Sequence, residues 1–174
     1  MGKKPLRVTM SVFVCLALTG LFSSCYPLKT PLQGGGSGFI REEFLDTRRL
    51  VILPFEGDET GEVTDTFFIA FRKGFPDMEI IERKKVRGLF REGDVELGHL
   101  DDGIRKRIGR ELGVQALVLG SVHYPSITRW LLQIKIIDSK TGEIMGRSLA
   151  EVGFMGAWGV REGCELAVQN LQVR

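Results

Sequence analysis

Apolar residues alternate between two kinds of pattern along this chain, and the first kind predicts strands. Leu50 to Phe55 and Ala116 to Val122 are short, continuous apolar runs, as in strands that are buried on both faces. Two further segments flank Ser139-Lys140-Thr141-Gly142, a sequence typical of a hairpin turn. The predicted strands are therefore 50–55, 78–82, 116–122, 128–138 and 143–152.

The second pattern has the period of an α-helix. Val63, Phe67, Ala70 and Phe71 recur at helical spacing, and Gly74 and Pro76 end the pattern. The same reasoning predicts a short helix at 86–90, a helix at 104–112 and a last helix from about 158 to 173, with a loop at 92–101. Asp101 or Asp102 can cap the helix at 104–112, and Gly113 can end it.

The order of these elements predicts an α/β (α+β) fold. Helices between the early strands imply crossover connections, and the late hairpin implies antiparallel pairing. We therefore expect a small mixed sheet of about five strands with helices packed on it.

The first 24 residues have the composition of a secretory signal. Lys3, Lys4 and Arg7 precede an apolar run from Val8 to Phe22, and Ser23-Ser24 follow it. The apolar run is short of the roughly 20 residues that a membrane-spanning helix needs. A cleaved signal peptide over residues 1–24 is the interpretation that fits.

Cys25 makes this interpretation more specific. The stretch Leu21-Phe22-Ser23-Ser24-Cys25 resembles the lipobox of bacterial lipoproteins, in which cleavage leaves the cysteine as a lipid-modified N-terminus. Tyr26 stands where an Asp typically retains lipoproteins at the inner membrane. The resemblance therefore implies a lipid anchor on Cys25 in the outer membrane, with the protein facing the periplasm.

After the lipid site, Pro and Gly residues predict a flexible tether over 25–48. The run Gly34-Gly35-Gly36-Ser37-Gly38 follows no visible strand, so it does not indicate a phosphate-binding loop. Such a tether spans roughly 25 Å as a coil and at most about 80 Å when extended. One compact domain then follows over 49–174, long enough to bury a core.

Composition and charge exclude several classes of protein. The chain has 174 residues, of which 26% are charged and 43% hydrophobic, so it is neither disordered nor collagen-like. The formal net charge of +2 comes from residues 1–24, because the remaining residues carry 21 basic and 22 acidic side chains. Nucleic acid is therefore not an expected partner.

Catalytic chemistry has little support in the sequence. His99 and His123 are the two histidines, and no Cys or His lies at metal-ligand spacing around either. Cys15 would leave with the signal, and Cys164 lies on an apolar helical stripe, as a buried cysteine does. We expect no catalytic residues, no cofactor and no metal.

Two features could form a surface for a partner. Arg105, Lys106, Arg107 and Arg110 lie on one predicted helix, although a solvated face explains them as well. The segment 153–159 places aromatic residues among glycines, either as a cap over the sheet or as an exposed anchor. The candidate surface residues are Arg105, Arg107, Arg110, Phe154 and Trp158.

Four segments occur in the order of a known family. The segments 51–55, 80–83, 108–122 and 137–144 resemble the periplasmic domain shared by the curli-secretion lipoprotein (CsgG) and the lipoprotein activator of penicillin-binding proteins (LpoB). The resemblance implies a mixed α/β domain without catalytic residues that acts by binding proteins. No segment remains here for the membrane hairpins of the curli channel, and the tether is shorter than that of the activator.

These observations predict an outer-membrane lipoprotein that is an assembly, secretion or envelope-biogenesis accessory factor. Its expected partners are the membrane, through the lipid, and periplasmic or outer-membrane proteins, including further copies of itself in a ring. Two alternatives stay open. One is a regulator that activates a peptidoglycan synthase. The other is a small periplasmic hydrolase or ligand-binding protein with a pocket at His99 or His123.

Overall fold

The computed structural model describes residues 35–81, 85, 95–96, 99–153 and 157–174. These residues belong to one compact unit, Pro31–Arg174. The predicted signal peptide, the lipid site Cys25 and the predicted helix at 86–90 lie outside the described residues.

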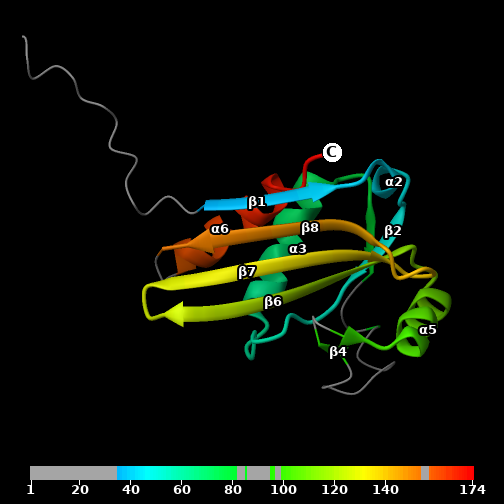
Figure 1. The fold of residues 1–174 in the computed structure, drawn as a ribbon, viewed down its shortest axis with the longest axis horizontal. Coiled ribbons are helices and arrows are strands. Elements are labelled where there is room, and N and C mark those ends of the chain that lie inside the picture. Colours follow the sequence, from blue (N-terminus) through cyan, green and yellow to red (C-terminus); the bar gives the residue numbers. More distant parts are fainter. Residues whose placement is uncertain (1–34, 82–84, 86–94, 97–98, 154–156) are drawn as a thin grey trace, which may run out of the picture. The chain divides into compact units, whose positions relative to one another are not determined.

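The centre of the fold is a mixed sheet with the strand order β1-β8-β7-β6-β2-β3 (Figure 1). The first four strands in this order pair antiparallel, whereas β2 pairs parallel with both β6 and β3. This confirms the α+β class, with six strands in place of about five. The strands are β1 (Gly35–Ile40), β2 (Arg49–Ile52), β3 (Glu79–Ile81), β6 (Ala116–Ser126), β7 (Arg129–Asp138) and β8 (Ile144–Val152).

Helices connect and cover this sheet. They are α2 (Glu42–Leu45), α3 (Glu62–Gly74), α5 (Asp102–Leu112) and α6 (Ala157–Gln169). The crossover helix α3 joins the parallel strands β2 and β3, as the apolar spacing predicted. Two short strands, β4 (Val95–Glu96) and β5 (His99–Leu100), pair within the stretch that we had predicted as a loop.

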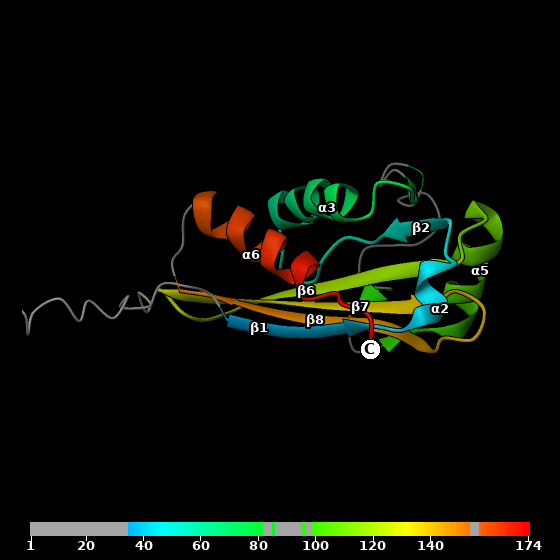
Figure 2. The ribbon, with the colours of Figure 1, turned by 90° about the horizontal axis from the view of Figure 1, so that it is seen from above.

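Helices pack on both faces of the sheet, and alternate side chains of each strand contact one face or the other. Alternate residues of β7, from Trp130 to Ile136, pack with α3 and α6 in the larger core. Ile108 of α5 packs with Leu117 and Leu119 of β6 in a second core on the opposite face. Figure 2 shows α3 and α6 on one side of the sheet and α5 at one end of it.

The strand β1 corrects the predicted tether. Residues 35–40 pair antiparallel with β8, and α2 follows, so the folded part begins well before residue 49. Glycine is required at Gly38, because a Cβ there would lie 2.7 Å from the backbone oxygen of Asn170. The glycines that indicated a flexible linker instead let the end of α6 approach the edge strand.

The end of the last helix also differs from the prediction. The helix α6 ends at Gln169, and the chain then runs beside β1. The backbone nitrogen of Ile40 donates to the oxygen of Gln172 at 2.8 Å, and that of Arg174 donates to the oxygen of Ile40 at 3.1 Å. These bonds satisfy backbone groups of the edge strand that a continuing helix would leave unpaired.

The predicted ends of α5 are confirmed. One carboxylate oxygen of Asp101 accepts hydrogen bonds from the backbone nitrogens of Gly103 at 2.7 Å and Ile104 at 3.2 Å. Gly113 ends the helix in the left-handed conformation, with φ of 63°. These two residues fix where α5 lies against the β7–β8 turn.

Candidate interaction surface

Arg105 is not part of an exposed surface, although its sequence context suggested one. Its side chain is 2% exposed. Its guanidinium donates to the backbone oxygens of Asp138 and Ser139 and forms an ion pair with Asp102 at 2.7 Å. Buried charge is tolerated only when it is paired in this way, so Arg105 holds α5 to the β7–β8 turn and is unavailable to a partner.

Arg107 and Arg110 do lie on the outer surface of α5. Arg107 pairs with Glu111 at 2.8 Å, one helical turn away. Arg110 lines a hollow of about 650 Å³ between α5 and the β7–β8 turn, together with Lys106 and Lys140. Their accessibility fits the predicted partner surface, and binding there stays a prediction.

The other predicted surface residues are only partly described. Phe154 lies outside the described residues, and the side chain of Trp158 is not described, although its backbone belongs to α6. Cys25, the predicted lipid site, also lies outside the described residues. None of the described helices is long and apolar enough to cross a membrane.

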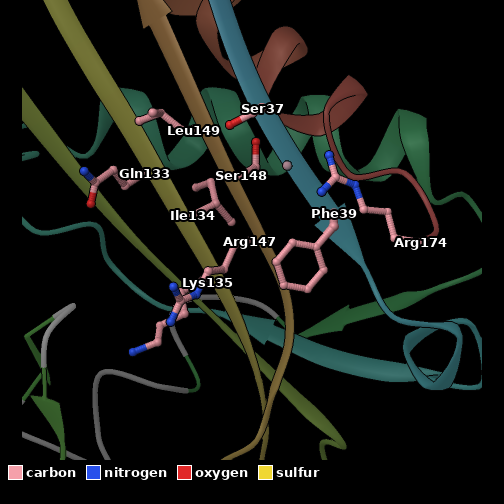
Figure 3. Close-up of a pocket in the computed structure, with 10 residues that line it drawn as sticks. Ser37, Phe39, Gln133, Ile134, Lys135, Arg147, Ser148, Leu149 and Arg174 are labelled. Carbon is pink, nitrogen blue, oxygen red and sulfur yellow. The ribbon is translucent and has the colours of Figure 1, made fainter.

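A second surface lies on the sheet itself. On β1, β8 and β7, the residues that do not face α3 and α6 form a surface that we call the open face. It contains a shallow hollow of about 470 Å³ (Figure 3). The open-face side chains that line this hollow are Ser37, Phe39, Gln133, Lys135, Arg147 and Leu149, and Arg174 lines it too.

Positive charge is concentrated at the centre of the open face. Lys135 and Arg147 are directly opposite each other across β7 and β8, and Phe39 is the β1 neighbour of Arg147. Figure 3 shows these three side chains in one row across the strands. Within the described residues, neither cation forms an ion pair. Directly opposed like charges destabilise a sheet, so this pair is suited to an anionic group from outside.

Sequence analysis missed the open face, because the turn alone would place Lys135 opposite Gly146. Lys135 is four residues before Ser139 and Arg147 is five residues after Gly142, and a register shift between Ile136 and Ile137 brings the two side chains opposite each other. Chemically, the surface offers two cations, the hydrogen-bonding groups of Ser37 and Gln133, and the apolar Leu149. This combination suits the recognition of acidic side chains.

The candidates for catalysis were His99, His123 and Cys164. His123 is exposed, with its Nε2 atom 3.1 Å from the hydroxyl oxygen of Ser121, whereas the side chain of His99 is not described. Cys164 is buried as predicted, and burial, with Asp58 and Glu165 nearby, raises the pKa of its thiol to about 12. No group of three or more potential metal ligands occurs among the described residues.

Comparisons with known proteins give a resemblance of fold. No protein-family model matches the sequence, and no curated protein matches it. A PelC dodecamer from Paraburkholderia phytofirmans has a similar fold, with a TM-score of 0.53 and 12% identity over 81% of this chain and 99% of the other. At this identity, the similarity concerns the fold alone.

Two further solved structures are more distantly similar. Lipoprotein GNA1162 from Neisseria meningitidis has a TM-score of 0.49 and 14% identity over 63% of this chain and 81% of the other. The LpoB C-terminal domain from Escherichia coli has a TM-score of 0.46 and 14% identity over 61% and 82% of the two chains. At these TM-scores and identities, neither similarity says more than that the folds are related.

Proposed function

We propose that this chain is a lipid-anchored component of the bacterial envelope that acts by binding other proteins and not by catalysis. The observation that carries the proposal is the sequence at the N-terminus, where a basic and apolar leader precedes Leu21-Phe22-Ser23-Ser24-Cys25. The fold supports it, because PelC, a protein that assembles as a dodecamer, has a similar one.

The position of β1 shortens the tether and so limits where the protein can act. Because β1 begins at Gly35, the tether contains only residues 26–34. Nine residues reach at most about 30 Å when fully extended and roughly 15–18 Å as a coil. The folded unit therefore works next to the membrane that holds the lipid, and anchoring raises its local concentration near partners there.

The open face is the surface that we assign to a partner protein. Lys135 and Arg147 present positive charge on rigid strands and have no ion-pair partner among the described residues, which suits an acidic segment of that partner. Leu149, which is 37% exposed, adds an apolar contact beside them. The partner is then an envelope protein with exposed Asp or Glu residues.

Lipid attachment is tested first, by metabolic labelling with a fatty acid. The wild-type chain should incorporate the label, and Cys25→Ser should leave an unlabelled precursor that still carries the signal peptide. The matched control is Cys164→Ser, which should be labelled like the wild type because that cysteine is buried. Normal labelling of Cys25→Ser would refute the proposal.

Protein binding is tested by a photo-crosslinking residue placed at Leu149 or, as a control, at Ile69 on the outer surface of α3. Both side chains are exposed, but Ile69 lies on the helical side of the sheet. A specific partner should crosslink from position 149, and replacing Lys135 and Arg147 with Glu should abolish that crosslink. Equal crosslinking from both positions would contradict the assignment. A peptidoglycan synthase as the crosslinked protein would favour the regulator alternative.

A second candidate function is structural, as one subunit of a ring. It is favoured by the similarity to PelC, which forms a dodecamer, and by the edge strand β1, since edge strands are common pairing sites. The native mass of the protein extracted in mild detergent tests it. One discrete particle of many copies is expected for a ring, whereas a monomer would exclude this candidate.

A further inference from the structure

The β6–β7 hairpin carries an unusually exposed apolar side chain at its tip. Ile127 is 89% exposed, the largest value among the exposed large apolar side chains of the described residues. Tyr124, just before the tip, is 52% exposed. A single exposed apolar residue is ordinary on a soluble surface, so its meaning depends on where the fold places it.

The fold places this tip at the end of the sheet where the tether is attached. Gly35, the first residue of β1, pairs with Glu151, and Glu151 pairs in turn with Leu131 of β7. Leu131 is the third residue of β7, and Ile127 lies in the two-residue turn just before that strand. Figure 1 shows the start of β1 and the β6–β7 turn at the same end of the sheet.

The length of the tether then brings this end to the lipid. With the lipid on Cys25, only residues 26–34 separate the bilayer from β1. We propose that the tip of the β6–β7 hairpin contacts the membrane, with Ile127 inserted among the lipids of the leaflet that holds the acyl chains. This inference rests on the proposed lipid attachment and adds a second contact that orients the folded unit.

The residues around Ile127 suit an apolar contact at a lipid surface. Ser126 and Thr128, on either side, are small and polar, and tyrosine favours the boundary between lipid and water, as Tyr124 would here. Arg129 is paired with Glu151 at 3.2 Å, so it adds no unpaired charge.

Acidic residues limit how the tip can bind. Partial burial raises the pKa of the Tyr124 hydroxyl, and the nearby carboxylates of Asp58 and Glu62 raise it further. Negative charge beside the tip does not attract anionic lipids. The contact is therefore apolar and should not depend on the content of anionic lipid or on salt.

The structure makes a selective test possible. In the lipidated protein the Cys25 thiol is blocked, and Cys164 is fully buried with a thiol pKa of about 12. An Ile127→Cys variant thus has one reactive thiol, which can carry an environment-sensitive fluorophore such as NBD. The matched controls are Ile69→Cys on α3, which is 57% exposed in the wild type, and Lys140→Cys in the turn at the opposite end of the sheet.

The labelled full-length lipoproteins are reconstituted into vesicles of phosphatidylethanolamine with a minor share of phosphatidylglycerol. Nitroxide groups on the lipid acyl chains should quench most of the fluorescence at position 127 and shift its emission to the blue. Dyes at positions 69 and 140 should keep most of their emission. Replacing the phosphatidylglycerol with phosphatidylcholine should leave the result unchanged.

Equal quenching at all three positions would overturn the proposal. A blue shift at 127 without quenching by the lipid nitroxides would also overturn it, because that result means burial against protein. Failure of the lipid attachment has its own signature, since an unmodified Cys25 would take up at least one further fluorophore per chain. A single label with no quenching at 127 would leave the anchor intact and refute only the hairpin contact.

Discussion

The buried arginine of α5 gives the sharpest test of the fold. Arg105→Ala removes a side chain that is 2% exposed and three hydrogen bonds, to Asp138 at 3.3 Å, Ser139 at 3.2 Å and Asp102 at 2.7 Å. The two bonds to backbone oxygens are long, and each contributes about 1 kcal/mol. The bond to Asp102 is short, but that carboxylate is 75% exposed and regains water when the partner is lost.

Adding the lost packing of the aliphatic stem, we expect Arg105→Ala to lower the free energy of unfolding by about 2–4 kcal/mol. That is a large part of the 5–15 kcal/mol typical of a domain. Arg107→Ala is the matched control, because Arg107 is 54% exposed and its pair with Glu111 is a surface pair within one helix. Its loss should cost less than about 0.5 kcal/mol.

Urea denaturation followed by circular dichroism measures both changes. The test protein is the mature chain from residue 25 onward with Cys25→Ser, because the described core lies wholly within residues 35–174. Arg105→Ala should lower the midpoint at an unchanged slope, and Arg107→Ala should leave it in place. Arg105→Lys should lie between them, because an ammonium group lacks the fork that reaches several acceptors. Equal midpoints for the two alanine variants would refute the structural role of Arg105.

Two further predictions concern β1 and the buried cysteine. Gly36→Ala should lower the urea midpoint, because its Cβ would meet the side chain of Asn170 and the backbone oxygen of Leu149. Gly35→Ala is the control, since a Cβ at that position has open space and should leave the midpoint unchanged. Equal midpoints for the two variants would mean that these glycines belong to a flexible tether. Cys164 should resist thiol reagents at pH 8 until urea is added. Folding raises the pKa of the Cys164 thiol from 9.0 to about 12. The contribution of this thiol to the free energy of unfolding is therefore complete below pH 9 and falls as the pH rises toward 12. Urea titrations over that range should show this loss in the wild type and not in Cys164→Ala.

Local sequence signals predicted those elements whose ends are fixed by contacts between residues close together in the sequence. The helix at 62–74 follows from apolar spacing and a glycine stop, and α5 follows from Asp101 and Gly113. The hairpin at 139–142 follows from its turn residues, because Asp138 accepts hydrogen bonds from the backbone nitrogens of both Lys140 and Thr141. In each case the stabilising contact lies close in sequence to the residue that signals it.

The strand β1 could not be predicted in this way. Its glycines carry no side-chain pattern, and the reason for them, the approach of Asn170, lies more than 130 residues away. Arg105 is a different case. It lies on the same helical face as Ile108 and Leu112, at spacings of three and seven residues, so its burial was visible in the sequence. The prediction nevertheless placed Arg105 on the surface, because a charged side chain is usually exposed.

The strand β7 relates the proposed contacts to one another. Arg129 begins the strand beside the hairpin tip, and Asp138 ends it beside Arg105 of α5, roughly 30 Å away at the rise of an extended strand. If the tip meets the lipid, α5 and its exposed Arg107 and Arg110 lie at the end of the sheet that points away from the membrane. The open face then stands between the two ends, where an anchored partner can reach Lys135 and Arg147 from the side.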